Sequence, residues 1–174
     1  MKVAMSLIAL MLPISAFSGW VDSSGKPIPE TPSMRSAGDF GAQLILTSSD
    51  QEFRKVWNAT TGTPKLQTTN HIKLGQSIAG VIVFSGCAPG PANTCNVTAD
   101  FSVQNPDGTT TLAGNGPVWL KAAPKRRIIV LGDASITLGF GKDDSPGTYK
   151  LIANVTDKVT QQTLMLALPF SVSK

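Results

Sequence analysis

The chain has 174 residues, of which 41% are hydrophobic and 15% are charged, and its formal net charge is +4. This length suits a single domain with its own hydrophobic core, so stability requires neither a disulfide lattice nor a structural metal. The small excess of positive charge does not indicate binding to nucleic acid, and it is compatible with a soluble small domain.

The first eighteen residues have the layout of a secretory signal peptide. Lys2 supplies a positive start, residues 3–14 form an apolar run without a charge, and residues 16–18 are a small-x-small triplet. The apolar run is shorter than a membrane-spanning helix, and no cysteine follows the triplet as it would in a lipoprotein. We therefore expect cleavage after Ser18 and a periplasmic or secreted protein without a transmembrane segment.

A leader precedes the expected domain. Residues 19–39 are rich in proline, serine and glycine and show no hydrophobic periodicity, as in an extended or disordered segment. We therefore predict a flexible leader over residues 19–39 and one folded domain over residues 40–174.

A strand and a short helix open the predicted domain. Residues 43–47 are a short apolar run of strand type. Ser49 and Glu52 then have the spacing of a capping box, which predicts a helix near residues 50–58. One face of this helix is apolar, at Phe53, Val56 and Trp57. We expect this face to pack against the core of the domain.

From residue 71 onward the sequence predicts strands. Residues 78–84 are apolar on both faces, as in the central strand of a sheet. Residues 97–104 alternate between apolar and polar side chains, and a turn sequence at residues 105–108 follows them. Further short strands are predicted at residues 118–120, 127–131 and 135–140.

The last thirty residues hold the clearest pattern. Apolar residues alternate with polar residues from residue 149 to 155 and again from 164 to 172, with a polar turn at 157–162 between them. This pattern predicts a long antiparallel hairpin. In total we expect eight or nine strands at spacings of about 8 to 15 residues, which is typical of an all-β sandwich.

Residues 144–149, Asp-Ser-Pro-Gly-Thr-Tyr, resemble the D-x-G-x-Y start of strand F in immunoglobulin-like domains, with one residue inserted. Residues 71–174 as a whole resemble exported bacterial immunoglobulin-like β-sandwich domains, many of which have no assigned activity. The resemblance implies an antiparallel immunoglobulin-like sandwich in which the Tyr149 hydroxyl closes a corner onto upstream backbone. No cysteine follows Tyr149, so the inter-sheet disulfide of antibody domains is not expected.

Cys87 and Cys95 flank a segment rich in turn-forming residues. An even cysteine count in an exported protein predicts a disulfide between them. The alternative is a zinc site, but zinc needs three or four ligands and His71 is the only histidine in the sequence. We therefore expect a disulfide that constrains one loop, and we expect neither a metal nor a cofactor.

The sequence offers weak candidates for catalysis. His71 would have to serve any Ser-His-Asp triad, but no G-x-S-x-G sequence accompanies it, so we expect a surface or packing histidine. Asp143 and Asp144 are adjacent carboxylates that lack the Asp-x-Asp spacing of calcium loops, so we expect Asp144 to shape a turn. We predict no catalytic residue.

Lys121, Lys125, Arg126 and Arg127 form the one dense basic segment of the sequence. Two interpretations stay open for this segment. It could bind an anionic partner, or it could be an ordinary solvated loop between two strands, where basic side chains protect sheet edges.

The export signal, the sandwich pattern and the lack of catalytic motifs favour a non-enzymatic binding or accessory domain. Its expected partner is another envelope or secreted protein, not a nucleic acid. Two alternatives stay open: a surface-structure subunit or adhesin that assembles by strand exchange, and a small secreted hydrolase or enzyme inhibitor.

Overall fold

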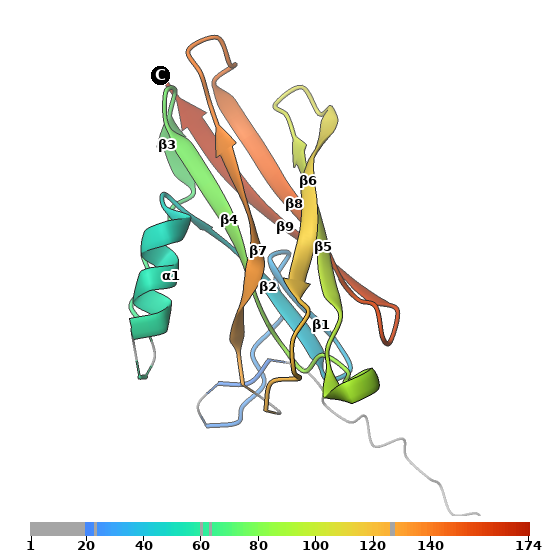
Figure 1. Ribbon diagram of the computed structural model, residues 1–174. Coiled ribbons are helices and arrows are strands. Elements are labelled where there is room, and N and C mark those ends of the chain that lie inside the picture. The colour runs from blue at the N-terminus through green and yellow to red at the C-terminus, as the bar shows by residue number, and fades with distance from the viewer. Residues whose placement is uncertain (1–19, 23, 60, 63, 126–127) are drawn as a thin grey trace, which may run out of the picture.

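Two β-sheets face each other across one hydrophobic core (Figure 1). The computed structural model describes residues 20–22, 24–59, 61–62, 64–125 and 128–174, and the predicted signal peptide lies outside these residues. The first sheet has the strand order β1-β2-β4-β7, and the second sheet has the order β3-β9-β8-β5-β6. All neighbours pair in antiparallel fashion except β3 and β9, which are parallel.

The described part of the chain contains nine strands, one α-helix and one short 3-10 helix. They are β1 (Met34–Ala37), β2 (Phe40–Thr47), α1 (Asp50–Ala59), β3 (His71–Lys73), β4 (Ser77–Ser85), η1 (Pro91–Asn93), β5 (Val97–Gln104), β6 (Thr110–Trp119), β7 (Val130–Gly139), β8 (Gly147–Asp157) and β9 (Gln162–Ser173). Within the described residues, no helix has the length and apolar character needed to span a bilayer.

This architecture confirms the predicted all-β sandwich with one short helix. In the first sheet, β2, β4 and β7 take the places of strands A, B and E of an immunoglobulin-like domain. In the second sheet, β9, β8 and β5 take the places of strands G, F and C, and β6 lies beside β5. β8 and β9 pair from end to end, which confirms the predicted hairpin.

Alternate residues of the strands fill the core. Leu151, Ala153 and Val155 of β8 are fully buried, as the alternating sequence predicted. Phe84 of β4 and Phe101 of β5 meet these residues in the same core cluster. Burial of such large apolar side chains is the main stabilising contribution to the fold.

β4 is buried on both faces, because α1 covers the outer face of the first sheet (Figure 1). The hydroxyl of Ser49 accepts a hydrogen bond from the Glu52 amide at 3.2 Å, so Ser49 caps the helix as predicted, while the Ser49 amide donates to the Thr47 hydroxyl at 3.3 Å. Phe53 of the helix is buried against Val81 and Val83 of β4. The apolar face of the helix therefore packs on the sheet, as expected.

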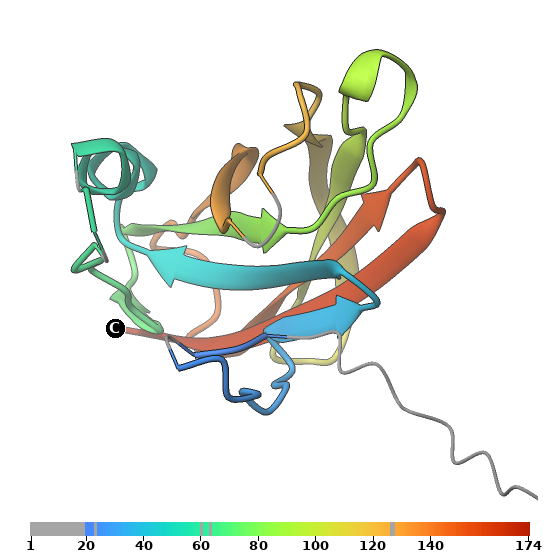
Figure 2. The same ribbon diagram turned by 90° about the horizontal axis from the view of Figure 1, so that it is seen from below.

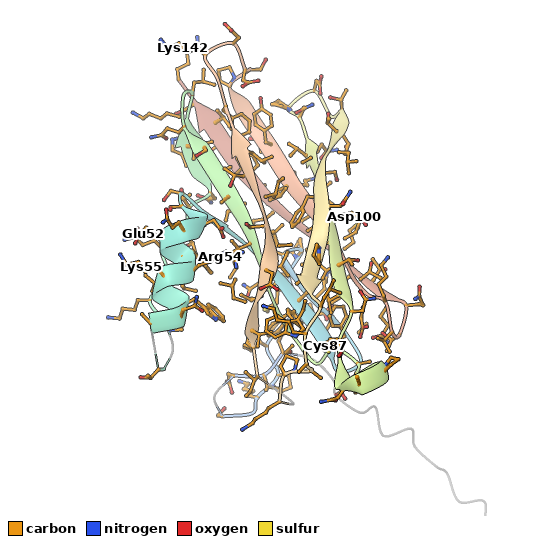
Figure 3. All side chains as sticks on the ribbon, in the orientation of Figure 1. Glu52, Arg54, Lys55, Cys87, Asp100 and Lys142 are labelled. Atoms are coloured by element: carbon orange, nitrogen blue, oxygen red, sulfur yellow. A yellow bond between two sulfur atoms is a disulfide. The ribbon has the colours of Figure 1, made fainter. Side chains whose placement is uncertain are left out.

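Arg54 attaches α1 to an irregular part of β7. The register between β4 and β7 shifts here, and residues 132–134 form a bulge. Arg54 donates hydrogen bonds to the carbonyl oxygens of Gly132 at 2.9 Å and Asp133 at 3.1 Å, and Asp50 holds the same guanidinium at 2.9 Å. Figure 3 shows Arg54 extending from the helix toward the sheet.

Two predicted strand boundaries are wrong. The strands predicted at residues 127–131 and 135–140 are one strand, β7, because the bulge interrupts the apolar pattern between them. The strand predicted at residues 118–120 is the end of the longer β6. The earlier part of β6 contains glycine, asparagine and proline, which have low strand propensity.

The leader predicted over residues 19–39 also needs correction, because it contains β1. This strand pairs with β2 along its whole length. Trp20 is buried, packs over Gly41 and donates its indole N–H to the Arg35 carbonyl at 3.1 Å. A four-residue edge strand is too short to show a clear alternation, which is why the pattern missed it. Trp20 and β1 therefore pack on the first sheet, while the described residues between 21 and 32 are exposed.

Candidate binding groove

Four connections meet at one end of the sandwich, which Figure 2 shows from below. They are the β1–β2 turn, the β4–β5 loop, the β6–β7 loop and the β8–β9 turn. A groove of about 670 Å³ lies between them, and we call it the disulfide-end groove. Its lining is largely apolar with polar groups between, and it includes Phe40, Cys87, Pro89, Pro124, Lys125 and Thr160.

Cys87 and Cys95 form the predicted disulfide. Both cysteines are buried, and Cys87 lies at this end of the sandwich in Figure 3. Between them the chain turns sharply, with φ of 56° at Ala92 and 57° at Asn93. A left-handed backbone is uncommon for alanine and more common for asparagine, and the disulfide and the hydrogen bond from the Gly90 amide to the Thr94 carbonyl both constrain this loop.

Backbone hydrogen bonds join the disulfide loop to the β6–β7 loop. The Cys95 amide donates to the Lys121 carbonyl at 2.9 Å, and the Ala123 amide donates to the Asn93 carbonyl at 2.9 Å. A short antiparallel bridge between the two loops lies between these bonds. The two loops therefore form one continuous wall of the disulfide-end groove.

Asp157, at the end of β8, joins the β8–β9 side of the groove to the β4–β5 loop. Its side chain is completely buried, and one carboxylate oxygen accepts the Ala88 amide at 2.8 Å while the other accepts the Val159 amide at 2.9 Å. Hydrogen bonds to a carboxylate are stronger than those between neutral groups. The sequence placed Asp157 in a polar turn and gave no sign of this role, because its partner Ala88 lies 69 residues away.

Gly86 lets the β1–β2 turn approach the disulfide loop. Its φ is 71°, and a Cβ atom at this position would overlap the carbonyl oxygen of Asp39. Only glycine combines this backbone conformation with the absence of a Cβ atom. Gly86 and Asp39 both line the groove, so the close approach shapes the groove directly.

The predicted basic segment divides between two places. Lys125 is exposed and lines the disulfide-end groove. Lys121 instead forms an ion pair with Asp133 at 2.8 Å, and its Nζ lies 4.8 Å from the centre of the Trp119 ring. Arg126 and Arg127 lie outside the described residues. Of the two described lysines, the structure therefore brings Lys125 to the groove.

Exposed apolar side chains gather in the loops beside the groove. Among the large hydrophobic residues that the structure describes as exposed, four lie in the β6–β7 loop and the β8–β9 turn: Leu120, Ile128, Ile129 and Val159. Exposed apolar groups next to a concave surface are typical of interaction sites. The sequence pattern placed Leu120, Ile128 and Ile129 in the strands predicted at residues 118–120 and 127–131 and Val159 in a polar turn, so it did not identify them as exposed loop residues beside a groove.

β3 and the β7–β8 loop, which carry the candidate catalytic residues, lie at the other end of the sandwich (Figure 1). His71 is exposed, and its ring nitrogens contact the hydroxyls of Ser171 at 2.8 Å and Ser173 at 3.3 Å. Asp144 accepts the Gly141 amide at 2.7 Å, as predicted for a turn residue. Across the described ranges, no group of three His, Cys, Asp or Glu side chains is placed to hold a metal ion.

Tyr149 closes this other end. Its hydroxyl donates a hydrogen bond to the Ser145 carbonyl at 2.7 Å, which confirms the corner that the resemblance implied. The ring packs against Phe140 and Phe170, with centroid distances of 4.9 and 5.6 Å. Such aromatic contacts contribute beyond simple burial of apolar area.

No family model matches the chain, and no curated protein matches it. Several solved structures resemble parts of the chain at low identity. One is a CARDB domain from Pyrococcus furiosus, with 13% identity and a TM-score of 0.39 over 60% of this chain and 80% of that one. Another is a β-glucosidase from Listeria innocua, with 11% identity and a TM-score of 0.44 over 90% of this chain and 19% of the enzyme.

A third similar structure is an alkylpurine DNA glycosylase from Pseudomonas fluorescens, with 12% identity and a TM-score of 0.39. The match covers 60% of this chain and 28% of the glycosylase. The chain therefore spans less than a third of the length of either enzyme. At these identities and TM-scores the likeness assigns neither a family nor an activity to this chain.

Proposed function

We propose that the chain is an exported, non-enzymatic binding domain that acts in the periplasm or outside the cell. In this proposal the disulfide-end groove holds a segment of a partner protein. The observation that supports it is the groove itself, whose walls are fixed by the disulfide and by the buried Asp157 carboxylate. A preorganised groove loses little conformational entropy when a partner binds.

The position of the groove in the fold supports the same function. The β4–β5 loop and the β8–β9 turn correspond to the B–C and F–G connections of immunoglobulin-like domains. Variable domains carry their antigen-binding loops at this end of the sandwich. This support is an analogy between folds, and the remaining support for a binding function comes from the residues at the groove. The disulfide also suits an exported protein, since disulfides persist in oxidising compartments.

The chemistry around the groove indicates the kind of partner. The apolar side chains of Leu120, Ile128 and Val159 favour a segment that offers apolar side chains of its own. Lys125 at the groove, followed in the sequence by two arginines, favours acidic groups at the edge of that segment. We therefore expect a protein segment that combines apolar anchors with acidic neighbours.

Site-specific photo-crosslinking in the producing cells tests the proposal. A photoreactive residue replaces Thr160 in the groove or, as a control, Asp100 on the outer face of the second sheet (Figure 3). We expect one discrete protein adduct from position 160 and none from position 100. The absence of an adduct at position 160, or the same adduct from both positions, would contradict the proposal.

A matched pair of charge changes sharpens this experiment. Lys125→Glu places a negative charge at the groove, whereas Lys142→Glu makes the same change at the opposite end (Figure 3). Lys125→Glu should lower the adduct yield several-fold, because it replaces attraction toward acidic groups of the partner with repulsion. Lys142→Glu should leave the yield unchanged. Equal yields from the two variants would show that charge at the groove does not contribute to binding.

A further inference from the structure

The four edge strands of the described sheets differ in their protection against pairing with another chain. β1 and β3 are only four and three residues long. β6 contains Pro117 and two register shifts against β5, which prevent a regular edge. The N-terminal part of β7 contains the bulge at residues 132–134, whose carbonyl groups Arg54 occupies. Natural edge strands commonly use such devices to avoid association.

Residues 135–139 of β7 have none of these protections. Their sequence, Ser-Ile-Thr-Leu-Gly, contains no charge and no proline. Their pairing with β4 is regular, from Ser135 opposite Val81 to Gly139 opposite Ser77. This stretch is therefore a regularly paired, uncharged edge that could accept another strand.

The hydrogen bonds of β4 show which backbone groups point outward. The Phe140 amide donates to the Gln76 carbonyl at 3.0 Å, so this residue pair is of the hydrogen-bonded kind. Such pairs alternate along an antiparallel ladder, so Leu138 and Ile136 also face β4. The amide and carbonyl groups of residues 135, 137 and 139 therefore point away from β4, on the side where the sheet ends.

The core-side residues of this edge are incompletely covered. Ile136 and Leu138 pack against the main core but are only partly buried. Their neighbours on β4, Gly80 and Ile78, are in the interior of the sheet, and Ile78 is completely buried. β4 has a strand on both sides, whereas β7 has a strand on one side only and Gly114 of β6, in the second sheet, lies close to Ile136.

We propose that residues 135–139 of β7 pair with the same residues of a second copy of this chain. The two strands run antiparallel about a two-fold axis at Thr137, so that Ser135 lies opposite Gly139 of the second copy. The outward amide and carbonyl groups of residues 135, 137 and 139 then satisfy one another across the axis. This contact is isologous, because both copies use the same surface.

In this register the side chains of residues 136–138 pair favourably with those of the second copy. Ile136 of one copy lies opposite Leu138 of the other on the core side, so both partly buried residues gain apolar cover. Thr137 meets Thr137 of the second copy on the outer side, and no like charges face each other within the strand. The contact is one strand wide, so we expect a weak dimer that forms at high protein concentration. It is independent of the disulfide-end groove.

Sedimentation velocity over a wide range of protein concentration tests this proposal. The wild-type protein should shift from monomer to dimer between micromolar and millimolar concentration. Thr137→Pro removes an amide that points away from β4, so it should abolish the dimer and leave the β4–β7 ladder intact. Thr137→Val keeps that amide and a β-branched side chain, so it should dimerise like the wild type. Far-ultraviolet circular dichroism and thermal unfolding verify that the variants fold.

Charge exchange at position 137 tests the two-fold register itself. Thr137→Lys and Thr137→Glu each place like charges opposite each other across the axis, so each variant alone should be monomeric. An equimolar mixture should form a heterodimer, because opposite charges then meet at the axis. A monomeric wild type at every concentration, a dimer that persists in Thr137→Pro, or a mixture that stays monomeric would each overturn the proposal. Lys125→Glu at the groove should not alter the dimer.

Discussion

Each end of the sandwich contains a hydrogen bond from a buried side chain to the backbone, but the two bonds have different structural effects. At one end the Tyr149 hydroxyl bonds to the carbonyl of Ser145, four residues earlier in the chain. At the other end the Asp157 carboxylate bonds to the amide of Ala88, which lies in a different loop. The first bond closes a local corner around packed aromatic rings, whereas the second bond holds two loops in place with a groove between them.

The hydrogen bond of Tyr149 stabilises the fold, whereas the contacts at the disulfide end also shape a binding groove. The corner at Tyr149 joins residues that the chain already places together, so it adds rigidity without creating a concave surface. The disulfide end brings four connections together and needs long-range contacts to position them. Binding sites are commonly carried by loops on a rigid scaffold, and this end has that organisation.

The largest expected effect is at Gly86. Gly86→Ala places a Cβ atom against the Asp39 carbonyl oxygen and forces a left-handed backbone on alanine, so it should lower the free energy of unfolding by about 3 to 4 kcal/mol. Gly108→Ala is the matched control at the other end, because Gly108 also has a positive φ but has open space around it. That change should cost about 1 kcal/mol. Urea unfolding of both variants measures the difference, and equal losses would show that the close approach at Gly86 is unimportant.

The disulfide should have the next largest effect. Replacing Cys87 and Cys95 together with serine removes a ring of nine residues, so the loss of stability should be at most about 2.6 kcal/mol. Hydrogen exchange should rise in the β4–β5 and β6–β7 loops, because the amides of Cys95 and Ala123 join these loops. Exchange around Tyr149 should stay unchanged. Global unfolding of the double variant, or faster exchange at both ends, would contradict a local role for the disulfide.

The sequence predicted those parts of the fold that depend on local pattern. The helix start at Ser49 and the alternation along β8 and β9 were identified because neighbouring residues determine them. β6 was largely missed, because Gly114 and Gly116 have low strand propensity. These two glycines lie close to Ile136 and Ala134 of β7, so pairing and close packing decide their conformation.

The candidate groove was mostly beyond prediction from sequence. Cysteine count and spacing identified the disulfide, and charge density identified Lys125. The sequence could not show that Asp157 reaches Ala88, because nothing local relates two residues that are 69 positions apart. Long-range contacts between loops define the groove, and such contacts follow from the arrangement of the strands.

The smallest loss of stability is expected at Tyr149, at the end of the sandwich opposite the disulfide. Tyr149→Phe removes the hydroxyl that bonds to Ser145 while it keeps the packed ring, so it should lower the free energy of unfolding by about 1 to 2 kcal/mol. An unchanged stability would show that the corner contributes nothing beyond packing.

The same residue predicts a dependence on pH. Burial raises the pKa of Tyr149, and the carboxylates of Asp144 and Asp107 raise it further. The folded state therefore favours the protonated hydroxyl, and the unfolded chain releases the proton near a pH of about 10. The stability that Tyr149 contributes should be complete below that pH and should fall as the pH rises through the pKa of the folded state. Because Tyr149 is the only tyrosine in the sequence, its ultraviolet absorbance titration reports this residue alone. A transition at or below the ordinary tyrosine pKa, or an equal alkaline loss of stability in wild type and Tyr149→Phe, would show that the hydroxyl is not held in the corner.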